Sequence, residues 1–295
     1  MPSLELSTEG EMNASEIDSL VDEMRRLFKA TLDKSRKPIL GESGQVFYSG
    51  WQTLEGKNGF YLMGLNPGGD PRDPELQIET IEKSLSDWLR REPEWSEYCD
   101  VDWGRRKLDP KEENRGNSRH QKRVKSFCTN CLGEHDVRNI FAANAIFERT
   151  KKGDHLPKGT SLDLICWQVH QLLFLSVRPK FIICLGHGPG SSFERLKSKQ
   201  WLKVVDSCEK AFSGPSGKKN FYIRWFEATK IQNPTPGLER LVRVIGVPHP
   251  SWFDLSADWF SEAWKTLPFL DPAPLTGKAY KEFKDARPEL EQANG

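Results

Sequence analysis

Residues 60–71 read Phe-Tyr-Leu-Met-Gly-Leu-Asn-Pro-Gly-Gly-Asp-Pro, and this stretch decides the fold. An apolar run of strand length ends in Gly and Pro, and a helical pattern of apolar residues begins soon after it. α/β proteins place their binding sites at strand-to-helix junctions of this kind. A second such junction lies far downstream, where the apolar run at residues 242–247 is followed by Pro-His-Pro-Ser at 248–251.

Strand-like and helix-like segments alternate along the whole chain. The expected strands cover residues 60–64, 137–147, 180–186, 221–226 and 242–247, and the expected helices cover residues 13–28, 76–91, 119–132, 161–177, 192–199 and 259–267. This alternation predicts an α/β protein, a three-layer α/β/α sandwich around a mainly parallel sheet of about four strands. We expect an N-terminal helix and lead-in at 1–58, a catalytic domain at 59–267 with a basic insertion at about 93–134, and a peripheral charged tail at 268–295.

Composition narrows the class of protein. The 295 residues carry a net charge of +1, so any nucleic-acid binding has to come from local basic patches. No apolar stretch has membrane-spanning length and no signal-peptide pattern is present, which predicts a soluble, cytoplasmic protein that does not bind membranes. The six cysteines suit free thiols better than a disulfide framework. We expect a monomer.

Three of the expected strands end at a polar residue, namely Asn66, Asn144 and His249. Parallel strands bring their carboxyl ends to one edge of a sheet, so these side chains are expected to converge. Each also has a simpler interpretation. Asn66 alone is typical of a turn, Asn144 of a strand-end cap, and His249 of a loop end without chemistry.

The ordered set of motifs resembles the uracil-DNA glycosylase superfamily over residues 60–267. Gly64-Leu65-Asn66-Pro67-Gly68 is similar to its first motif in the asparagine form of the mismatch-specific and single-strand-selective branches. His249-Pro250-Ser251 is similar to the second motif, and Asn144 falls where the family has a strand-end asparagine that reads a pyrimidine edge.

The resemblance implies a monofunctional DNA glycosylase with DNA as its partner and no cofactor. Asn66 and His249 would be catalytic: Asn66 would position water, and His249 would hydrogen-bond the base as it leaves with negative charge. The base-binding residues would be Gly64, Leu65, Gly68 and Asn144. The base must first leave the helix to reach such a pocket.

Contacts to DNA are expected from two segments. Ser251, Trp252 and Phe253 follow the second motif, and the two aromatic residues are candidates to wedge into the space the flipped base vacates. Packing beneath the last helix is an equally good interpretation of both. Arg119, Lys122 and Arg123 belong to a basic stretch at 105–125, which either tracks a phosphate backbone or is a solvated face.

Gly68 predicts a roomy pocket. In the strictly uracil-specific branch this position carries a tyrosine that blocks substituents at C5 of the pyrimidine, so the resemblance implies that C5-modified pyrimidines are accepted here. Trp95, Tyr98 and Trp103 of the insertion would contact such a group.

Several functions compete with each other. The substrate could be uracil or a C5-modified pyrimidine, or a hypermodified base such as glucosylated hydroxymethylcytosine removed from phage DNA in antiviral defence. A non-catalytic nucleic-acid-binding homologue is a further alternative. A nucleotide or sugar-phosphate enzyme is disfavoured, because Gly-His-Gly-Pro-Gly at 186–190 lacks the Lys-Ser/Thr of a phosphate loop.

Cys128 and Cys131 have the spacing of a metal-ligand pair, and some branches of the superfamily carry an iron–sulfur cluster. Both cysteines fall on the apolar face of the expected helix 119–132, however, and Cys99 is their only neighbour in sequence. Structural metal sites show paired spacings, so we predict core packing and no metal.

Overall fold

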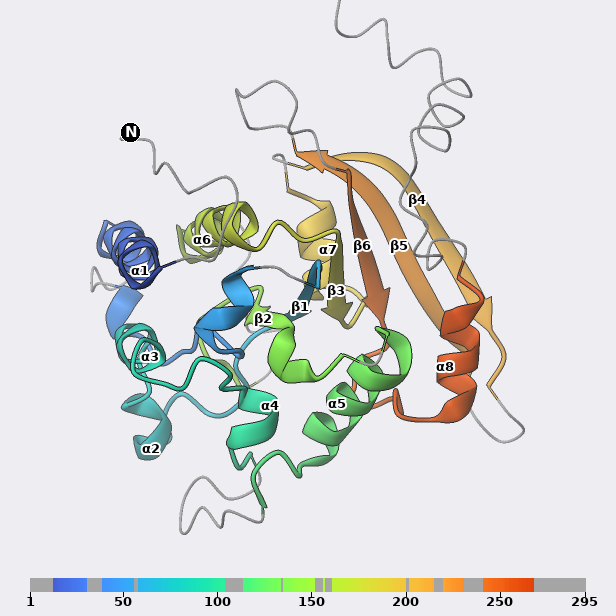
Figure 1. Cartoon of the computed structure of the whole chain (residues 1–295), viewed down its shortest axis with the longest axis horizontal. Helices are drawn as coiled ribbons and strands as arrows, with labels where there is room; N and C mark the ends of the chain where they lie inside the picture. Colours follow the sequence, from blue (N-terminus) through green and yellow to red (C-terminus); the bar gives the residue numbers. More distant parts are fainter. Residues whose placement is uncertain are drawn as a thin grey trace, which may run out of the picture.

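The computed structural model describes residues 13–30, 39–55, 58–103, 114–133, 135–151, 156, 161–199, 202–214, 220–230 and 241–267. Its helices are α1 (Ala14–Lys29), α2 (Pro74–Gln77), α3 (Ile81–Trp88), α4 (Glu97–Asp100), α5 (Arg119–Cys131), α6 (Ser161–Val177), α7 (Ser192–Lys197) and α8 (Asp258–Lys265). Its strands are β1 (Phe60–Gly64), β2 (Phe141–Asn144), β3 (Phe181–Leu185), β4 (Leu202–Phe212), β5 (Phe221–Lys230) and β6 (Leu241–Val247). Figure 1 shows their arrangement.

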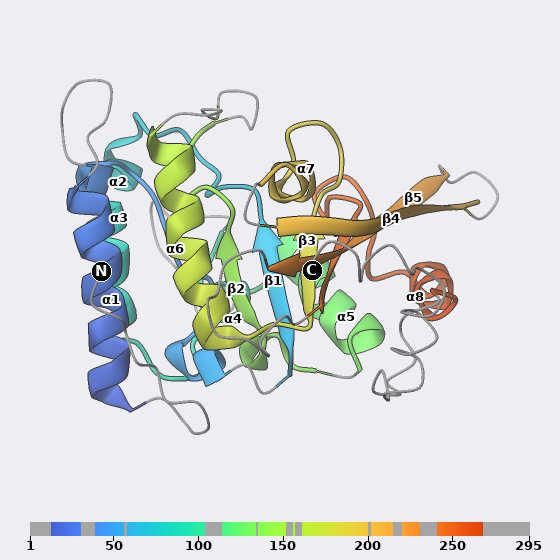
Figure 2. The same ribbon diagram turned by 90° about the horizontal axis from the view of Figure 1, so that it is seen from above.

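The strands form one mixed sheet of six strands in the order β2-β1-β3-β6-β5-β4. β2, β1, β3 and β6 run parallel, with Gly64 of β1 opposite Asn144 of β2 and Leu185 of β3 opposite Val247 of β6. β5 pairs antiparallel with β6, and β4 pairs antiparallel with β5. The long β4–β5 hairpin extends away from the helices at one side of the molecule (Figure 2).

Both faces of the sheet are covered. On β1, Tyr61 and Met63 belong to one buried cluster together with α1, α3, α6 and α7. Leu62 belongs to a second buried cluster together with α5 and α8. Successive side chains of a strand point to opposite faces, so the two clusters lie on opposite sides of the sheet. Figure 1 shows α1 and α6 on one side and α5 on the other.

The first helix confirms its expected start. The side chain of Asn13 accepts from the backbone N–H of Glu16, and the Glu16 carboxylate accepts from the backbone N–H of Asn13. This reciprocal capping box satisfies two donors that a helix start would otherwise leave exposed. Its buried residues then join the same cluster as Tyr61, so α1 packs directly into the core of the sheet.

The sheet is larger than the predicted sheet of about four strands, and it is mixed. The strand β4 was not expected, and β5 extends to Lys230 rather than ending near 226. The expected strand at 137–147 is confined to Phe141–Asn144, after a 3-10 turn at Val137–Asn139. The expected helix at 76–91 is two helices, because Thr80 starts α3 afresh by accepting from the backbone N–H of Lys83.

Within these described residues, none of the helices has the length and apolar character to cross a membrane. The N-terminal lead-in at 1–12, residues 104–113 of the basic stretch and the tail at 268–295 lie outside the described residues, so the expectations for them stay predictions.

Candidate functional site

Four strand exits meet at one edge of the sheet. Asn144 is the last residue of β2 and stands opposite Gly64, the last residue of β1. Asn66 lies two residues beyond β1, and His249 lies two residues beyond β6. Gly186 follows β3, and a Cβ added there would be 3.5 Å from Cδ2 of His249, so the His249 ring lies over the exit of β3, beside β1. The parallel strands therefore bring the three predicted residues to a common edge.

The loop after β1 is fastened to the chain that follows β2. The backbone N–H groups of Ala145, Ile146 and Thr150 donate to the carbonyls of Gly64, Leu65 and Pro67, at 2.9, 2.9 and 3.3 Å. The buried guanidinium of Arg149 adds a bond from Nη1 to the carbonyl of Gly68. Four carbonyls of the 64–68 loop are thus held by residues 145–150, which fixes where Asn66 stands.

The amide of Asn66 is oriented by its partners. Nδ2 donates to the carbonyl oxygen of Pro67 at 2.8 Å and to Oγ1 of Thr150 at 3.0 Å. A carbonyl oxygen can only accept, so the NH₂ group must face Pro67 and the amide cannot be flipped. The half-buried side chain therefore presents Oδ1, an acceptor, away from these contacts.

Asn144 carries a buried donor with no hydrogen-bond partner among the described residues. Its side chain is only 5% exposed, and Nδ2 has no acceptor within reach. A Cβ at Gly64 would lie 2.2 Å from Oδ1 of Asn144, so only glycine at position 64 leaves room for this amide. Leaving a buried N–H unsatisfied costs roughly 1–3 kcal/mol. Such a group is expected to be satisfied when a ligand places an acceptor against it.

The strand exit of Asn144 is also braced from behind. Nε2 of the fully buried His170 lies 3.0 Å from the backbone carbonyl of Asn144, and Nδ1 of His170 lies 2.8 Å from the hydroxyl of Tyr61. Nε2 must donate to the carbonyl, so Nδ1 accepts from the Tyr61 hydroxyl. Burial lowers the pKa of His170 to about 4, which agrees with this neutral ring.

His249 is held as a neutral ring of one tautomer. The backbone N–H of Ser251 donates to Nδ1 of His249 at 3.2 Å, so the proton of the neutral ring sits on Nε2. Desolvation of the ring lowers the pKa of His249 below its usual value, which favours the neutral form near pH 7. Nε2–H is left as the donor of this side chain.

The two glycines of the first motif differ in their backbone. Gly69 has a φ of 116°, and a Cβ there would lie 2.6 Å from the Leu76 side chain, so Gly69 is the residue that the turn requires. Gly68 is exposed and lacks a positive φ, and a Cβ there would meet nothing within 4 Å. A side chain at position 68 would therefore extend into open space.

Trp252 and Phe253 divide between their two interpretations. Trp252 is 89% exposed, the most exposed large apolar side chain among the described residues. Phe253 instead packs against the rings of Phe221, Trp259 and Phe260 at centroid distances of 5.0, 5.3 and 5.8 Å. The tryptophan is free to reach a partner, and the phenylalanine belongs to the packing around α8.

The predicted basic contacts also divide. Arg119 and Lys122 are exposed on α5. Nη1 of Arg123 donates to the carbonyl of Pro250 at 2.7 Å, and its Nε lies 3.4 Å from the carboxylate of Asp254. Arg123 therefore holds the His249 loop, while its two neighbours remain candidates for phosphate contacts.

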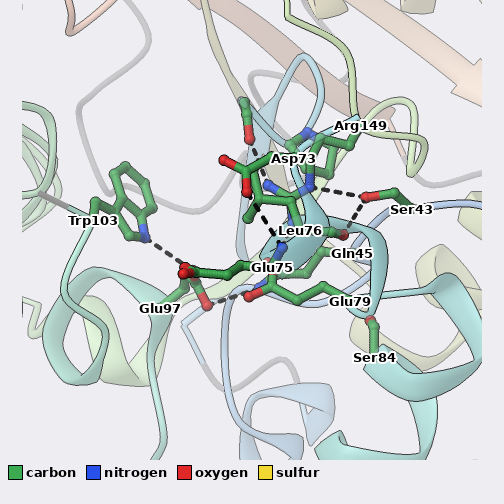
Figure 3. A network of polar contacts seen from close by, with 12 residues as sticks. Ser43, Gln45, Asp73, Glu75, Leu76, Glu79, Ser84, Glu97, Trp103 and Arg149 are labelled. Carbon is green, nitrogen blue, oxygen red and sulfur yellow. Dashed lines mark hydrogen bonds and ion pairs between the residues drawn. The ribbon is translucent and has the colours of Figure 1, made fainter. Parts of the chain in front are cut away.

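The aromatic residues of the insertion are engaged inside the protein. Tyr98 is 3% exposed and packs near Tyr48, and Trp95 lies under the guanidinium of Arg91. Nε1 of Trp103 donates to the buried carboxylate of Glu97 at 2.9 Å, and Nε2 of Gln45 donates to the other oxygen of that carboxylate at 2.8 Å. Figure 3 shows this network beside the contacts of Arg149 with Ser43 and Glu79.

A cavity of about 470 Å³ opens between α2, α3 and α4, with Gln45, Glu79 and Glu97 in its walls. Its walls contain neither Asn66, Asn144 nor His249. The strand-exit site is thus a distinct place on the molecule, and we base its assignment on side-chain geometry.

Cys128 and Cys131 pack in the buried cluster around α5, as the sequence predicted. Burial raises the pKa of both thiols, that of Cys131 to about 12, so both are protonated at neutral pH. Across the described part of the chain no group of three or more His, Cys, Asp or Glu is arranged to hold a metal ion.

Sequence reasoning missed three residues that position the site. Arg149 and Thr150 hold the Asn66 loop, and His120 of α5 lies against His249, with ring centroids 5.4 Å apart. The first two stand in a polar loop with no motif, and His120 stands within a run of basic residues, so no pattern marked them.

Comparison of the sequence with protein-family models and with curated proteins finds no match. The assignment of the site therefore rests on its own geometry and on the motifs that it contains.

Proposed function

We propose that this protein is a monofunctional DNA glycosylase that flips out and excises uracil or a C5-modified pyrimidine, leaving an abasic site. The observation that carries the proposal is the buried Nδ2 of Asn144, which lacks a partner among the described residues at the edge where Asn66 and His249 also stand. A carbonyl oxygen on a pyrimidine edge is an acceptor of the kind this donor needs. The fold supports the proposal through its four adjacent parallel strands, the core expected from the resemblance to the uracil-DNA glycosylase superfamily.

The reaction breaks the bond between C1′ of the sugar and the base nitrogen. The bonding electrons leave with the base, and the sugar becomes an electrophilic oxocarbenium-like centre. A water then bonds to C1′ and loses a proton. This electrophile needs a well-placed water more than a strong base, and Oδ1 of Asn66, an acceptor on a fixed amide, suits that task.

His249 would act on the leaving base. Nε2–H of a neutral imidazole can donate to an oxygen of the base as negative charge develops there. Because the tautomer is set before substrate arrives, no reorganisation is required during bond cleavage. Asn144 would meanwhile hold the Watson–Crick edge, which fixes the glycosidic bond relative to Asn66.

The substrate range is the second part of the proposal. The positive φ of the turn falls on Gly69, so Gly68 is not required by the backbone, and the space beside it is open. This favours acceptance of C5-substituted pyrimidines. Removal of a hypermodified base from phage DNA, as in antiviral defence, is the alternative that the same opening favours.

The proposal is tested with duplex and single-stranded oligonucleotides that each contain one candidate base. The panel holds uracil, thymine, 5-hydroxymethyluracil, 5-hydroxymethylcytosine and glucosylated hydroxymethylcytosine. After incubation, alkali cleaves at abasic sites and the fragments are measured on a denaturing gel. We expect cleavage at a subset that includes a C5-modified base, and none without the alkali step. Intact strands throughout the panel would contradict a glycosylase.

Trp252 and Phe253 offer a matched pair of variants. Trp252→Ala is expected to weaken binding and excision on duplex DNA while leaving the melting temperature unchanged, because the indole is exposed. Phe253→Ala is expected to lower the free energy of unfolding by about 2 kcal/mol, because its ring packs on three others. Thermal denaturation and duplex-binding titrations measure the two effects. Full duplex activity in Trp252→Ala would remove the wedge from the mechanism.

A further inference from the structure

One side of α5 faces the loop that carries His249. Nδ1 of His120 lies 3.1 Å from Oγ of Ser251, and the His120 ring meets the His249 ring nearly edge to face, at 68°. One turn later Arg123 bonds the carbonyl of Pro250. Residues three apart lie on the same side of a helix, so His120 and Arg123 grip the loop together, while Arg119 and Lys122 stay exposed.

His120 is itself held firmly. Its ring stacks on Tyr98 with an interplanar angle of 6° and contacts Trp103 at 5.3 Å between centroids. The helix start beside it is fixed by the Ser118–Gln121 capping box. Nε2 of Gln121 also donates to the carbonyls of Glu97 and Val101, at 2.9 and 2.7 Å. The insertion therefore builds a rigid support for this imidazole.

Ser251 connects the two histidines. Its backbone N–H donates to Nδ1 of His249, and its hydroxyl bonds Nδ1 of His120. A residue that fixes Ser251 therefore also fixes the N–H that selects the tautomer of His249. Partners of this indirect kind orient a functional imidazole in many sites.

We propose that His120 is a positioning residue for His249, acting through Ser251 to keep the proton of His249 on Nε2. The insertion thereby completes the reactive edge of the sheet as well as carrying exposed basic residues. The catalytic part of this inference rests on the proposed glycosylase function. The structural part, the control of the His249 tautomer, does not.

The test is a double-mutant cycle with His120→Phe and Ser251→Ala. Phenylalanine keeps an aromatic ring against Tyr98 and His249 but cannot bond the Ser251 hydroxyl. His120→Asn is the rescue variant, because its amide can restore that hydrogen bond. His135→Phe is the matched control, since His135 is a partly buried histidine whose ring contacts Phe60 and not the site.

Nitrogen-detected NMR of the histidine rings is the first readout, and it needs no substrate. In the wild type, His135→Phe and His120→Asn, we expect His249 to carry its proton on Nε2. In His120→Phe we expect a mixture of tautomers. An unchanged His249 spectrum in His120→Phe would overturn the inference, whatever the protein turns out to excise.

Single-turnover excision is the second readout. His120→Phe is expected to slow it about tenfold with DNA binding unchanged, as loss of an orienting partner does. The double variant should be no slower than the slower single variant, because both changes break one connection. Fully multiplicative losses would show that His120 acts independently of Ser251 and would overturn the proposal. A wild type without any excision activity would refute the proposed function and leave the NMR result to decide the inference.

Discussion

Replacing Asn66 with alanine is expected to abolish most base excision while leaving DNA binding nearly intact. Oδ1 of Asn66 would hold the attacking water, an interaction that matters in the transition state and little in the bound ground state. His249→Ala is expected to slow excision on the order of a hundredfold or more, as removal of a donor to developing negative charge does. Single-turnover rates and fluorescence anisotropy with a labelled oligonucleotide measure the two quantities separately.

Asn139→Ala is a suitable control, because Asn139 is an exposed asparagine in the turn before β2. It is expected to match the wild type in rate and binding. If Asn66→Ala and His249→Ala both excised at near wild-type rates, the strand-exit site would not be the reactive centre. Equal losses of rate and of binding in Asn66→Ala would instead assign this asparagine to substrate binding.

Gly68→Tyr is expected to convert a broad substrate range into a narrow one. Its Cβ meets nothing within 4 Å, so the tyrosine can be accommodated without disturbing the backbone. The ring would then occupy the space that a C5 substituent needs, a steric route to specificity. We expect excision of C5-modified bases to be lost while activity on plain uracil survives. The ratio of the two excision rates is the measurement.

Gly41→Tyr serves as its control, since a Cβ at Gly41 also meets nothing within 4 Å and lies outside the site. It is expected to leave the ratio unchanged. If the wild type removes unsubstituted uracil alone, the opening beside Gly68 is unrelated to the substrate and the pocket argument fails.

The predictions from sequence succeeded where one signal dominated. The Asn13 capping box, the apolar face of α5 and the strand-to-helix junction at 60–71 each have a local physical cause, and each is present. The strand β4 was missed because it alternates poorly: its exposed residues include Ser207, Cys208 and Glu209 in succession. Its conformation comes from ten residues paired with β5, which is a tertiary effect that no local pattern records.

The site shows the same limit. Asn66, Asn144 and His249 were found because parallel strands must end at one edge. Arg149 was not found, because a buried arginine that bonds a loop carbonyl resembles any other arginine in a polar loop. The hydrogen bond from Arg123 to Pro250 likewise depends on how α5 is docked, and sequence shows only a basic residue.

The β4–β5 hairpin moves the open edge of the sheet away from the site. Without it, β6 would be an edge strand, and its unpaired backbone groups could recruit a strand of another molecule. With it, β6 is paired on both sides and the outer edge is β4, where exposed Lys203 and Glu209 disfavour such pairing. At the opposite edge, Phe47 bridges to Ala143 of β2 and shields that strand. We therefore expect the protein to resist edge-to-edge aggregation at high concentration, with the strand that leads to His249 enclosed inside the sheet.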